Sequence, residues 1–336
     1  MKNNIKKLIK PILAGVLAVI LTLPMLASAQ TLKLATEAGA KDSPAGNALR
    51  KWGELIEENS KGELKVQVFY QYELGGQQEM FDLLMAGDLD IMLNWPLTSY
   101  NKKMGVVYSP YMTLSWDEAL DAYSPGGWIY SMLDGIYTET GLKFFGPWPE
   151  GFNGVGTRDK YALTMADAKN IKVRTMPLFP FPQTMQALGY QTANIDWGEV
   201  YTALQTGVVD GDAGNVIFWD YEYFRDALDY YVATNHMFMT AILTMNIDSY
   251  ESLSEEHQKI VSDAAEIIMN DQFQAAQKND QFYISKWKEA GKQYLEPSEE
   301  ELKAMAKVVR EKVWPVMAEE FGEDIITTIR SNAKPL

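Results

Sequence analysis

Beyond an apolar leader, the beginning of the chain alternates short apolar stretches with longer amphipathic ones. The apolar stretches at residues 32–35, 64–68 and 89–93 have the length of strands, and the second alternates with polar residues. Between them, apolar positions three and four apart predict helices over residues 43–61 and 75–84. The first of these helices starts with a serine cap followed by proline. A strand–helix–strand–helix–strand order is the unit of a parallel sheet covered by helices.

The same order of elements returns about 120 residues further along the chain. A strand at residues 171–174 is followed by a helix through 185–188 and a short strand at 191–193. An Asp-x-x-Glu capping box then predicts a helix over residues 196–206, and an apolar pair at 208–209 starts another strand. The repetition indicates two similar α/β lobes.

The end of the chain is predicted to be helical. Residues 255–290 contain neither proline nor glycine, and Ser254 is a suitable cap at their start. At ~1.5 Å per residue this helix would be roughly 50 Å long, which is longer than one lobe needs. A second capping box, Ser298 with Glu301, opens a further helix. We expect the long helix to span both lobes.

These patterns predict an α/β protein of two lobes, each a βαβ-type sheet flanked by helices. The expected first lobe combines residues 30–151 with about 240–281. The expected second lobe combines residues 152–239 with about 282–336.

The leader itself has the parts of a secretory signal peptide. Four lysines precede an almost wholly apolar run over residues 11–26, and Ala27-Ser28-Ala29 supplies the small residues of a cleavage site. The run is shorter than the ~20 residues that a membrane span needs. We expect residues 1–29 to be cleaved on export, which leaves Gln30 as the first mature residue. Because the chain has no cysteine, we expect neither a disulfide nor a lipid anchor, and a bacterial periplasm as its compartment.

Charge and composition exclude several classes of function. Loss of the leader would change the formal charge from −15 to −19, because four lysines and no acidic residue are removed. A protein with this negative charge is repelled by nucleic acid and by anionic lipid, which argues against both as partners. Without cysteine and with only two histidines, His236 and His257, thiol catalysis and histidine-rich zinc sites are excluded. The sequence also lacks a Gly-x-Ser-x-Gly elbow and a phosphate-binding loop.

One acidic segment is a candidate for a hard cation. Asp210, Asp212, Asn215 and Asp220 lie close together in the sequence, but their spacing does not follow the calcium-loop pattern. Acidic loops of acidic proteins are usually solvated, so we expect no metal and no cofactor.

Arg174 has an unusual place in the charge pattern. The following fifty residues, 175–224, contain no lysine or arginine but six carboxylates. Arg174 also lies near the carboxyl end of its predicted strand, the edge where open α/β sheets bind ligands. A guanidinium matches a carboxylate or sulfonate with two parallel hydrogen bonds. The alternative is a structural ion pair with one of the nearby carboxylates, and position alone leaves both open.

Four tryptophans lie in corresponding regions of the two lobes. Trp95 follows the third strand of the first lobe, whereas Trp148, Trp197 and Trp219 surround the same region of the second. An indole can close a cleft over an apolar ligand and donate one hydrogen bond. Ordinary core packing is the alternative for each of them, and we expect two or three of the four at a site. His236 is expected to be structural.

Several segments resemble the sequence motifs of one known family. Residues 166–174, ADAKNIKVR, resemble a "DLKGLKIR" signature, and residues 199–211, EVYTALQTGVVDG, an "EVYxALQxGxVDG" element. Residues 234–236 match a "TNH" motif, and residues 72–75 an "xxLG" turn. With these motifs the chain resembles the DctP-type periplasmic solute-binding subunits of TRAP transporters, and the resemblance covers essentially the whole mature chain in the expected order.

This resemblance implies the two-lobed periplasmic binding protein fold, closing on a small organic acid. It implies a non-enzymatic protein that delivers its ligand to the small and large membrane subunits of a TRAP permease, driven by an ion gradient. Arg174 matches the family's arginine that grips the ligand carboxylate. Trp197 falls where a ring commonly lines the pocket, and Trp95 where a polar or acidic contact often lies. A monomer is expected for a carrier that must dock and leave.

The chain departs from the sialic-acid-type members at two positions. Their second arginine is missing, since that region reads Phe152-Asn153-Gly154, and their asparagine after "VDG" is displaced to Asn215. Both departures favour a smaller acid with one strong anionic group, such as a monocarboxylate, keto acid or sulfonate. A dicarboxylate stays open if Asn153, Tyr201 or a backbone amide holds its far end.

The alternatives to this reading are a binding protein for an ATP-driven importer or a chemoreceptor, and an exported hydrolase with paired carboxylates. Glu37, in the loop after the first strand, and Phe179, after Arg174, are further candidates for the pocket. The complete set of expected ligand-binding residues is Arg174, Trp197, Trp95, Asn153, Asn215, Glu37, Phe179, Tyr201, Trp219 and Asp212.

Overall fold

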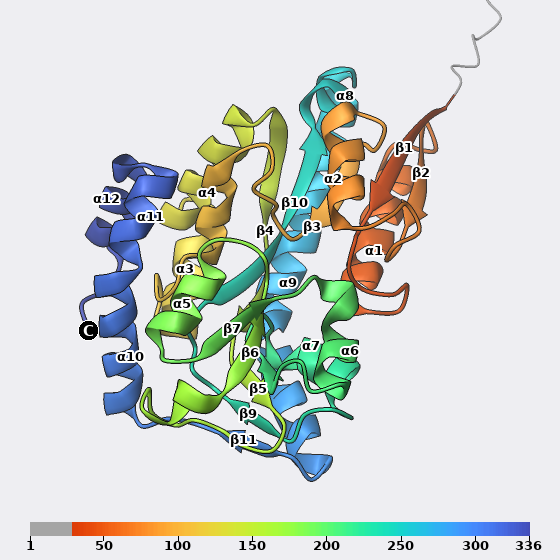
Figure 1. Cartoon of the computed structure of the whole chain (residues 1–336). Helices are drawn as coiled ribbons and strands as arrows, with labels where there is room; N and C mark the ends of the chain where they lie inside the picture. The colour runs from red at the N-terminus through yellow and green to blue at the C-terminus, as the bar shows by residue number, and fades with distance from the viewer. Residues whose placement is uncertain (1–28) are drawn as a thin grey trace, which may run out of the picture.

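The computed structural model describes residues 29–336, so nearly all of the expected signal peptide lies outside the described residues. Two mixed sheets with flanking helices form the two lobes (Figure 1). The predicted two-lobed α/β fold is confirmed. Among residues 29–336, no helix combines the length and the apolar character that crossing a membrane requires.

The first sheet has the strand order β2-β1-β3-β10-β4. β1 pairs in parallel with β2 and β3, whereas β10 is antiparallel to both β3 and β4. The side chain of Ser43 caps α1 by accepting a hydrogen bond from Gly46 N, as its sequence predicts. The elements are β1 (Gln30–Ala35), α1 (Pro44–Asn59), β2 (Leu64–Phe69), α2 (Gln77–Ala86), β3 (Ile91–Asn94), η1 (Lys102–Tyr108), α3 (Trp116–Tyr123), α4 (Trp128–Glu139), β4 (Leu142–Phe152), β10 (Phe238–Asn246) and α8 (Ile247–Glu251).

The second sheet has the strand order β11-β9-β5-β8-β6-β7. Its parallel core is β7-β6-β8, with β5 antiparallel to β8. The elements are β5 (Val155–Thr157), η2 (Asp167–Asn170), β6 (Lys172–Thr175), α5 (Phe181–Ala187), β7 (Gln191–Asn194), η3 (Trp197–Glu199), α6 (Val200–Gln205), β8 (Gly211–Asp212), α7 (Ile217–Trp219), η4 (Asp220–Phe224), β9 (Tyr230–Val232) and β11 (Gln293–Leu295).

Two local expectations in this lobe are wrong. The strand does not start at residue 208: the N–H groups of Val208 and Val209 both bind the carbonyl of Ala203 and close the helix end, so β8 begins only at Gly211. The side chain of Asp196 makes no cap bond, and its backbone carbonyl accepts the N–H of Glu199 instead. The expected helix therefore starts as the short 3-10 turn η3.

The long helix α9 (Glu255–Glu289) has 35 residues and contacts both lobes, as predicted. At its start, Trp52 of α1 donates its indole N–H to the carbonyl of Val261. At its end, Trp287 packs in the core of the second lobe and donates to the carbonyl of Gln293, where β11 begins. Helix α9 thus ties the two sheets together (Figure 1).

The C-terminal helices are α10 (Glu299–Lys312), α11 (Trp314–Phe321) and α12 (Glu323–Asn332). They form a column along one side of the molecule (Figure 1) and do not pack on the second lobe alone. Arg310 and Trp314 donate hydrogen bonds to the carbonyls of Tyr111 and Pro110 in the first lobe, while α10 also contacts α5 of the second. The boundary expected near residue 282 stays a prediction.

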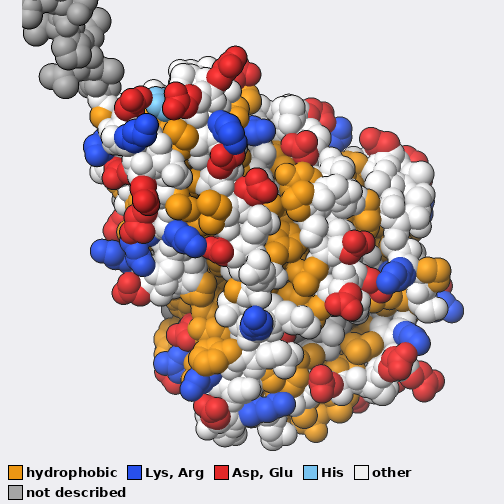
Figure 2. Space-filling view, turned by 180° about the vertical axis from the view of Figure 1, so that it is seen from behind, with side chains coloured by type: hydrophobic (Ala, Val, Ile, Leu, Met, Phe, Trp, Pro, Cys, Tyr) orange, Lys and Arg blue, Asp and Glu red, His pale blue; other side chains and the backbone are white. Residues whose placement is uncertain are grey.

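The surface carries charges of both signs. Figure 2 shows acidic and basic side chains intermixed over the face opposite to that of Figure 1. Opposite charges pair at the surface, as Lys51 does with Asp271 and Lys103 with Glu139. Such exposed pairs contribute little to stability, so the fold depends on its buried apolar core.

Candidate functional site

A cavity of about 490 Å3 is walled by residues from both lobes. Glu37 follows β1 and Trp95 follows β3 in the first lobe, whereas Arg174 lies on β6 and Asn215 follows β8 in the second. The carboxyl ends of parallel strands in both sheets therefore meet at one place, as is typical of ligand sites in open α/β sheets. The lining residues are Glu37, Ala38, Tyr72, Gly76, Gln77, Gln78, Glu79, Trp95, Leu97, Arg174, Met176, Pro177, Leu178, Asp196, Trp197, Gly198, Gly214, Asn215, Trp219 and Met239.

Arg174 is held from within the second lobe and still reaches the cavity wall. Its Nε donates to the carbonyl of Ile195 at 2.8 Å, and its Nη1 donates to Oδ1 of Asp212 at 3.1 Å. Among the described residues no hydrogen bond engages Nη2. The arginine is 2% exposed, so its guanidinium is fixed before any ligand arrives. Arg174 can therefore keep its ion pair with Asp212 and still bind an anion in the cavity.

Two buried acidic residues, Asp212 and Asp220, lie close to Arg174. Burial raises the pKa of Asp212, although Arg174 and the N–H of Gly214 act in the opposite direction. Burial, together with the neighbouring Asp212, raises the pKa of Asp220 well above its usual range. Oδ1 of Asp220 accepts a hydrogen bond from the side-chain amide of Asn215 at 3.1 Å. Asp212 is the residue that pairs directly with Arg174, at 3.1 Å.

Three tryptophans form a continuous aromatic wall. Trp219 packs edge-to-face on Trp95 at 5.5 Å between ring centroids and on Trp197 at 5.4 Å. Edge-to-face packing of this kind holds the three indole rings in fixed orientations, and the rings in turn shape the cavity. Because Trp95 belongs to the first lobe and the other two to the second, the wall crosses the boundary between the lobes.

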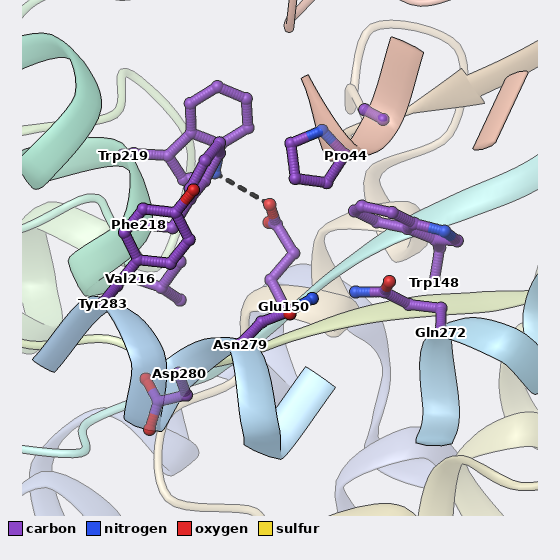
Figure 3. A pocket seen from close by; sticks show the side chains of 11 residues that line it. Pro44, Trp148, Glu150, Val216, Phe218, Trp219, Gln272, Asn279, Asp280 and Tyr283 are labelled. Atoms are coloured by element: carbon purple, nitrogen blue, oxygen red, sulfur yellow. Dashed lines mark hydrogen bonds between the residues drawn. The ribbon is translucent and has the colours of Figure 1, made fainter. Parts of the chain in front are cut away.

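A buried carboxylate lies directly behind this wall. Oε1 of Glu150 accepts the indole N–H of Trp219 at 2.8 Å, and Oε2 accepts that of Trp95 at 2.7 Å. Figure 3 shows the Trp219 bond and the small pocket that contains Glu150. Burial raises the pKa of Glu150 to about 7, against the opposite effect of the two indole bonds.

A second acidic group faces the cavity from the first lobe. Glu37 is 4% exposed and its Oε1 accepts the backbone N–H of Trp95 at 2.7 Å. Its Oε2 has no hydrogen-bond partner among residues 29–336. Burial raises the pKa of Glu37 to about 8. This carboxyl is therefore protonated at neutral pH and can either donate a hydrogen bond or release its proton.

Comparison with known proteins identifies the family. Residues 34–320 match DctP, described as "Bacterial extracellular solute-binding protein, family 7". The chain belongs to this family.

Relatives of this DctP-family protein bind different small solutes. The ectoine-binding periplasmic protein TeaA of Halomonas elongata is 33% identical over 215 residues, 63% of this chain and 62% of that relative, which is less than two thirds of its length. The 2,3-diketo-L-gulonate-binding periplasmic protein YiaO of Escherichia coli is 26% identical over 270 residues, 79% of this chain and 80% of the relative.

Solved structures of TRAP-transporter binding proteins share the fold. The ectoine-binding protein of the TeaABC transporter of Halomonas elongata superposes with a TM-score of 0.82 at 24% identity, covering 91% of this chain and 100% of that one. A periplasmic solute-binding protein of Sulfurospirillum deleyianum with bound succinate gives a TM-score of 0.80 at 21% identity, with the same coverage.

The DctP-family protein does not bring every expected site residue to the cavity wall. Phe179 turns away and packs on Phe321 at 5.4 Å, and Tyr201 is 39% exposed with its hydroxyl bound by Gln205. Asn153 is fully buried at a backbone bridge to Val216. Asp212, which binds Arg174, is likewise not a wall residue. The six expected residues that do line the cavity are Glu37, Trp95, Arg174, Trp197, Asn215 and Trp219.

Some residues of the wall were not expected from the sequence. Tyr72 has a positive φ of 57°, in the turn that carries the "xxLG" motif, and that motif was its only signal. Gln77, at the start of α2, donates to the carbonyl of Trp95 at 3.1 Å. Glu150 could have been noticed as a lone carboxylate in the apolar and glycine-rich strand β4.

Gly214 is required by the position of Arg174. A Cβ at this residue would lie 2.5 Å from Nη1 of Arg174, which its bonds to Ile195 and Asp212 prevent from moving aside freely. We expect Gly214→Ala to weaken ligand binding by about tenfold or more, equivalent to about 1.4 kcal/mol. Isothermal titration calorimetry measures this change.

Gly198→Ala is the matched control, because Gly198 also lines the cavity but its Cβ would only approach the Tyr72 hydroxyl at 3.6 Å. Equal losses for the two variants would contradict the role assigned to Gly214.

Proposed function

We propose that this protein captures a small organic anion and delivers it to the small and large membrane subunits of a TRAP permease. The observation that carries the proposal is Arg174. Among the described residues that line the cavity it is the only basic one, and it is buried and fixed in place. Charge-assisted hydrogen bonds to a carboxylate are worth roughly 1.5–3 kcal/mol each. The ligand should therefore carry one dominant acid group.

The proposal includes export and a periplasmic location. The signal-like residues 1–29 support cleavage before Gln30, and the curated relatives TeaA and YiaO are periplasmic proteins. We further propose that the protein acts as a monomer that docks on the permease and leaves it. Uptake of ligand by vesicles containing the paired membrane subunits, only when the binding protein is added, tests the delivery step.

The size of the cavity supports a small solute. A volume of about 490 Å3 lies within the ~300–1,000 Å3 range of small-molecule sites. Asn153 and Tyr201 do not line the cavity, so neither is placed to bind a second acid group of the ligand. This favours a monocarboxylate, keto acid or sulfonate over a dicarboxylate.

A second candidate class is a compact zwitterion. Glu37 faces the cavity with one oxygen unpartnered among the described residues, and it can accept a hydrogen bond from a cationic nitrogen after releasing its proton. The aromatic wall of Trp95, Trp197 and Trp219 can stabilise the same cation. Ectoine, which the relative TeaA binds, carries both a carboxylate and a cationic nitrogen.

A thermal-shift screen tests the proposed function. Purified mature protein is heated with a panel of monocarboxylates, keto acids, sulfonates, dicarboxylates and ectoine. A true ligand at a hundredfold excess over its dissociation constant stabilises the folded protein by ~2.7 kcal/mol, which raises the melting temperature. Stabilisation that persists in Arg174→Ala, or no response to any organic anion, would contradict the proposal.

The pH dependence of affinity separates the two ligand classes. A zwitterion binds ionised Glu37, so its affinity should rise with pH until the pKa of about 8 in the free protein is passed. A simple anion binds the protonated form, so its affinity should fall above that pH. Calorimetric titrations at pH 6, 7, 8 and 9 measure both trends, and Glu37→Gln should abolish either one.

A further inference from the structure

Glu150 lies at an irregularity of the longest strand pair. In the β4–β10 register, Met239 opposes Gly151 and Thr240 opposes Pro149, so Glu150 has no partner on β10. Gly151 has a φ of 138°, which favours glycine. An extra residue of this kind is a β-bulge, and bulges commonly re-aim a side chain next to a functional site. The bulge therefore turns the Glu150 side chain away from the direction that the regular alternation of side chains along a β-strand would give it.

In this position the carboxylate of Glu150 contacts residues of both lobes. Its two oxygens accept indole N–H groups from Trp95 of the first lobe and Trp219 of the second. Both tryptophans line the cavity, whereas Glu150 is buried and does not. Figure 3 shows its hydrogen bond to Trp219. One side chain is therefore bonded to aromatic wall residues from both sides of the cavity.

The cost of this arrangement indicates that it has a purpose beyond packing. Removing a carboxylate from water is unfavourable, and an apolar side chain of similar volume is often equally or more stabilising in such a place. The two indole rings would also touch each other without it, since they pack edge-to-face. What the carboxylate adds is a fixed orientation for both rings.

We propose that Glu150 is a positioning residue, which orients Trp95 and Trp219 together and so determines the shape of the ligand cavity. The proposal rests on the proposed function, because it concerns the wall of the same site. Glu150 itself does not touch the ligand. Its influence passes through two hydrogen bonds, and each can be removed separately by Trp95→Phe and Trp219→Phe.

The first test needs no ligand. The nine tryptophans give nine indole 1H–15N resonances, and the two Trp→Phe variants assign those of Trp95 and Trp219. Glu150→Gln keeps the size of the side chain but turns one acceptor into a donor. We expect the resonances of Trp95 and Trp219 to shift and their indole hydrogens to exchange faster. Unchanged resonances for both tryptophans would overturn the proposal.

The second test is a double-mutant cycle on affinity, with ectoine and pyruvate as the probes. Glu150→Gln should weaken binding of the accepted probe by about tenfold or more, as loss of a charge-assisted hydrogen bond does. In the Trp95→Phe/Trp219→Phe background the same change should cost less than about twofold, because its hydrogen bonds are already gone. Additive losses would show that Glu150 acts by another route.

Controls separate this proposal from folding defects and from the proposed function. Glu139→Gln removes a surface carboxylate that pairs with Lys103 in the same lobe, and it should change neither readout. If Glu150→Gln fails to fold, the Trp→Phe variants with Glu150 intact must still weaken binding. If wild-type protein binds neither probe while the indole shifts occur, the ligand classes are wrong and the positioning role stands.

Discussion

Replacing Arg174 by alanine is expected to reduce ligand affinity by about a hundredfold or more. The change removes the one basic group among the described wall residues and leaves the bound anion without a partner. Truncating one partner of a buried, hydrogen-bonded charge pair typically costs about 2–5 kcal/mol, and 2.7 kcal/mol corresponds to about a hundredfold. Calorimetry with the best ligand from the screen measures the loss.

Arg174→Lys should not restore binding. An ammonium cannot bond Ile195, Asp212 and the ligand with the planar geometry of a guanidinium. Arg225→Ala is the matched control, since Arg225 is a half-exposed arginine of the same lobe that pairs with Glu222. Near-normal affinity in Arg174→Ala would overturn the assignment of the anion site.

Replacing Asp212 by alanine is expected to destabilise the ligand-free protein by about 3–5 kcal/mol. Arg174 would remain buried without its carboxylate, which is the costly way to break a buried ion pair. The N–H of Gly214 would lose its acceptor as well. Urea unfolding followed by tryptophan fluorescence, at the same pH for both proteins, measures the difference in free energy of unfolding.

The same substitution should increase the stabilisation that the ligand provides. In Asp212→Ala a bound anion supplies the missing negative charge, so the ligand-induced rise in melting temperature should exceed that of the wild type. Asp263→Ala removes an exposed partner of Lys259 and should change little. A loss in Asp212→Ala no larger than in this control would show that Asp212 is not needed to balance Arg174.

The order of elements could be predicted from the sequence because local patterns decide it. The alternation in β2 and the serine-proline start of α1 depend only on neighbouring residues. The strand expected at Val208 failed because apolar residues at a helix exit satisfy the strand pattern equally well, and backbone bonds to Ala203 decide the outcome. The packing of helices α10 to α12 could not be predicted, because it depends on contacts with residues far away in the sequence.

The site could be predicted in part for the same reason. Arg174 was visible because no other basic residue occurs in the fifty residues after it, and Trp95 and Trp197 because they follow strands whose ends face the cavity. The sequence shows Glu150 only as a lone carboxylate in β4, since its role depends on a register shift against β10, more than 80 residues away in the sequence. Phe179 has the expected position in the chain, but its ring packs on Phe321 instead of facing the cavity.

The strand order of the first sheet constrains when that lobe can fold. β10, the strand between β3 and β4, ends at Asn246, so it leaves the ribosome long after the other strands of the sheet. Until then β3 and β4 each expose an unpaired edge, which is prone to pairing with other chains. A nascent chain that ends before Phe238 cannot complete this lobe. The protein therefore depends on late, long-range pairing, which slows folding and makes protection of the emerging chain valuable.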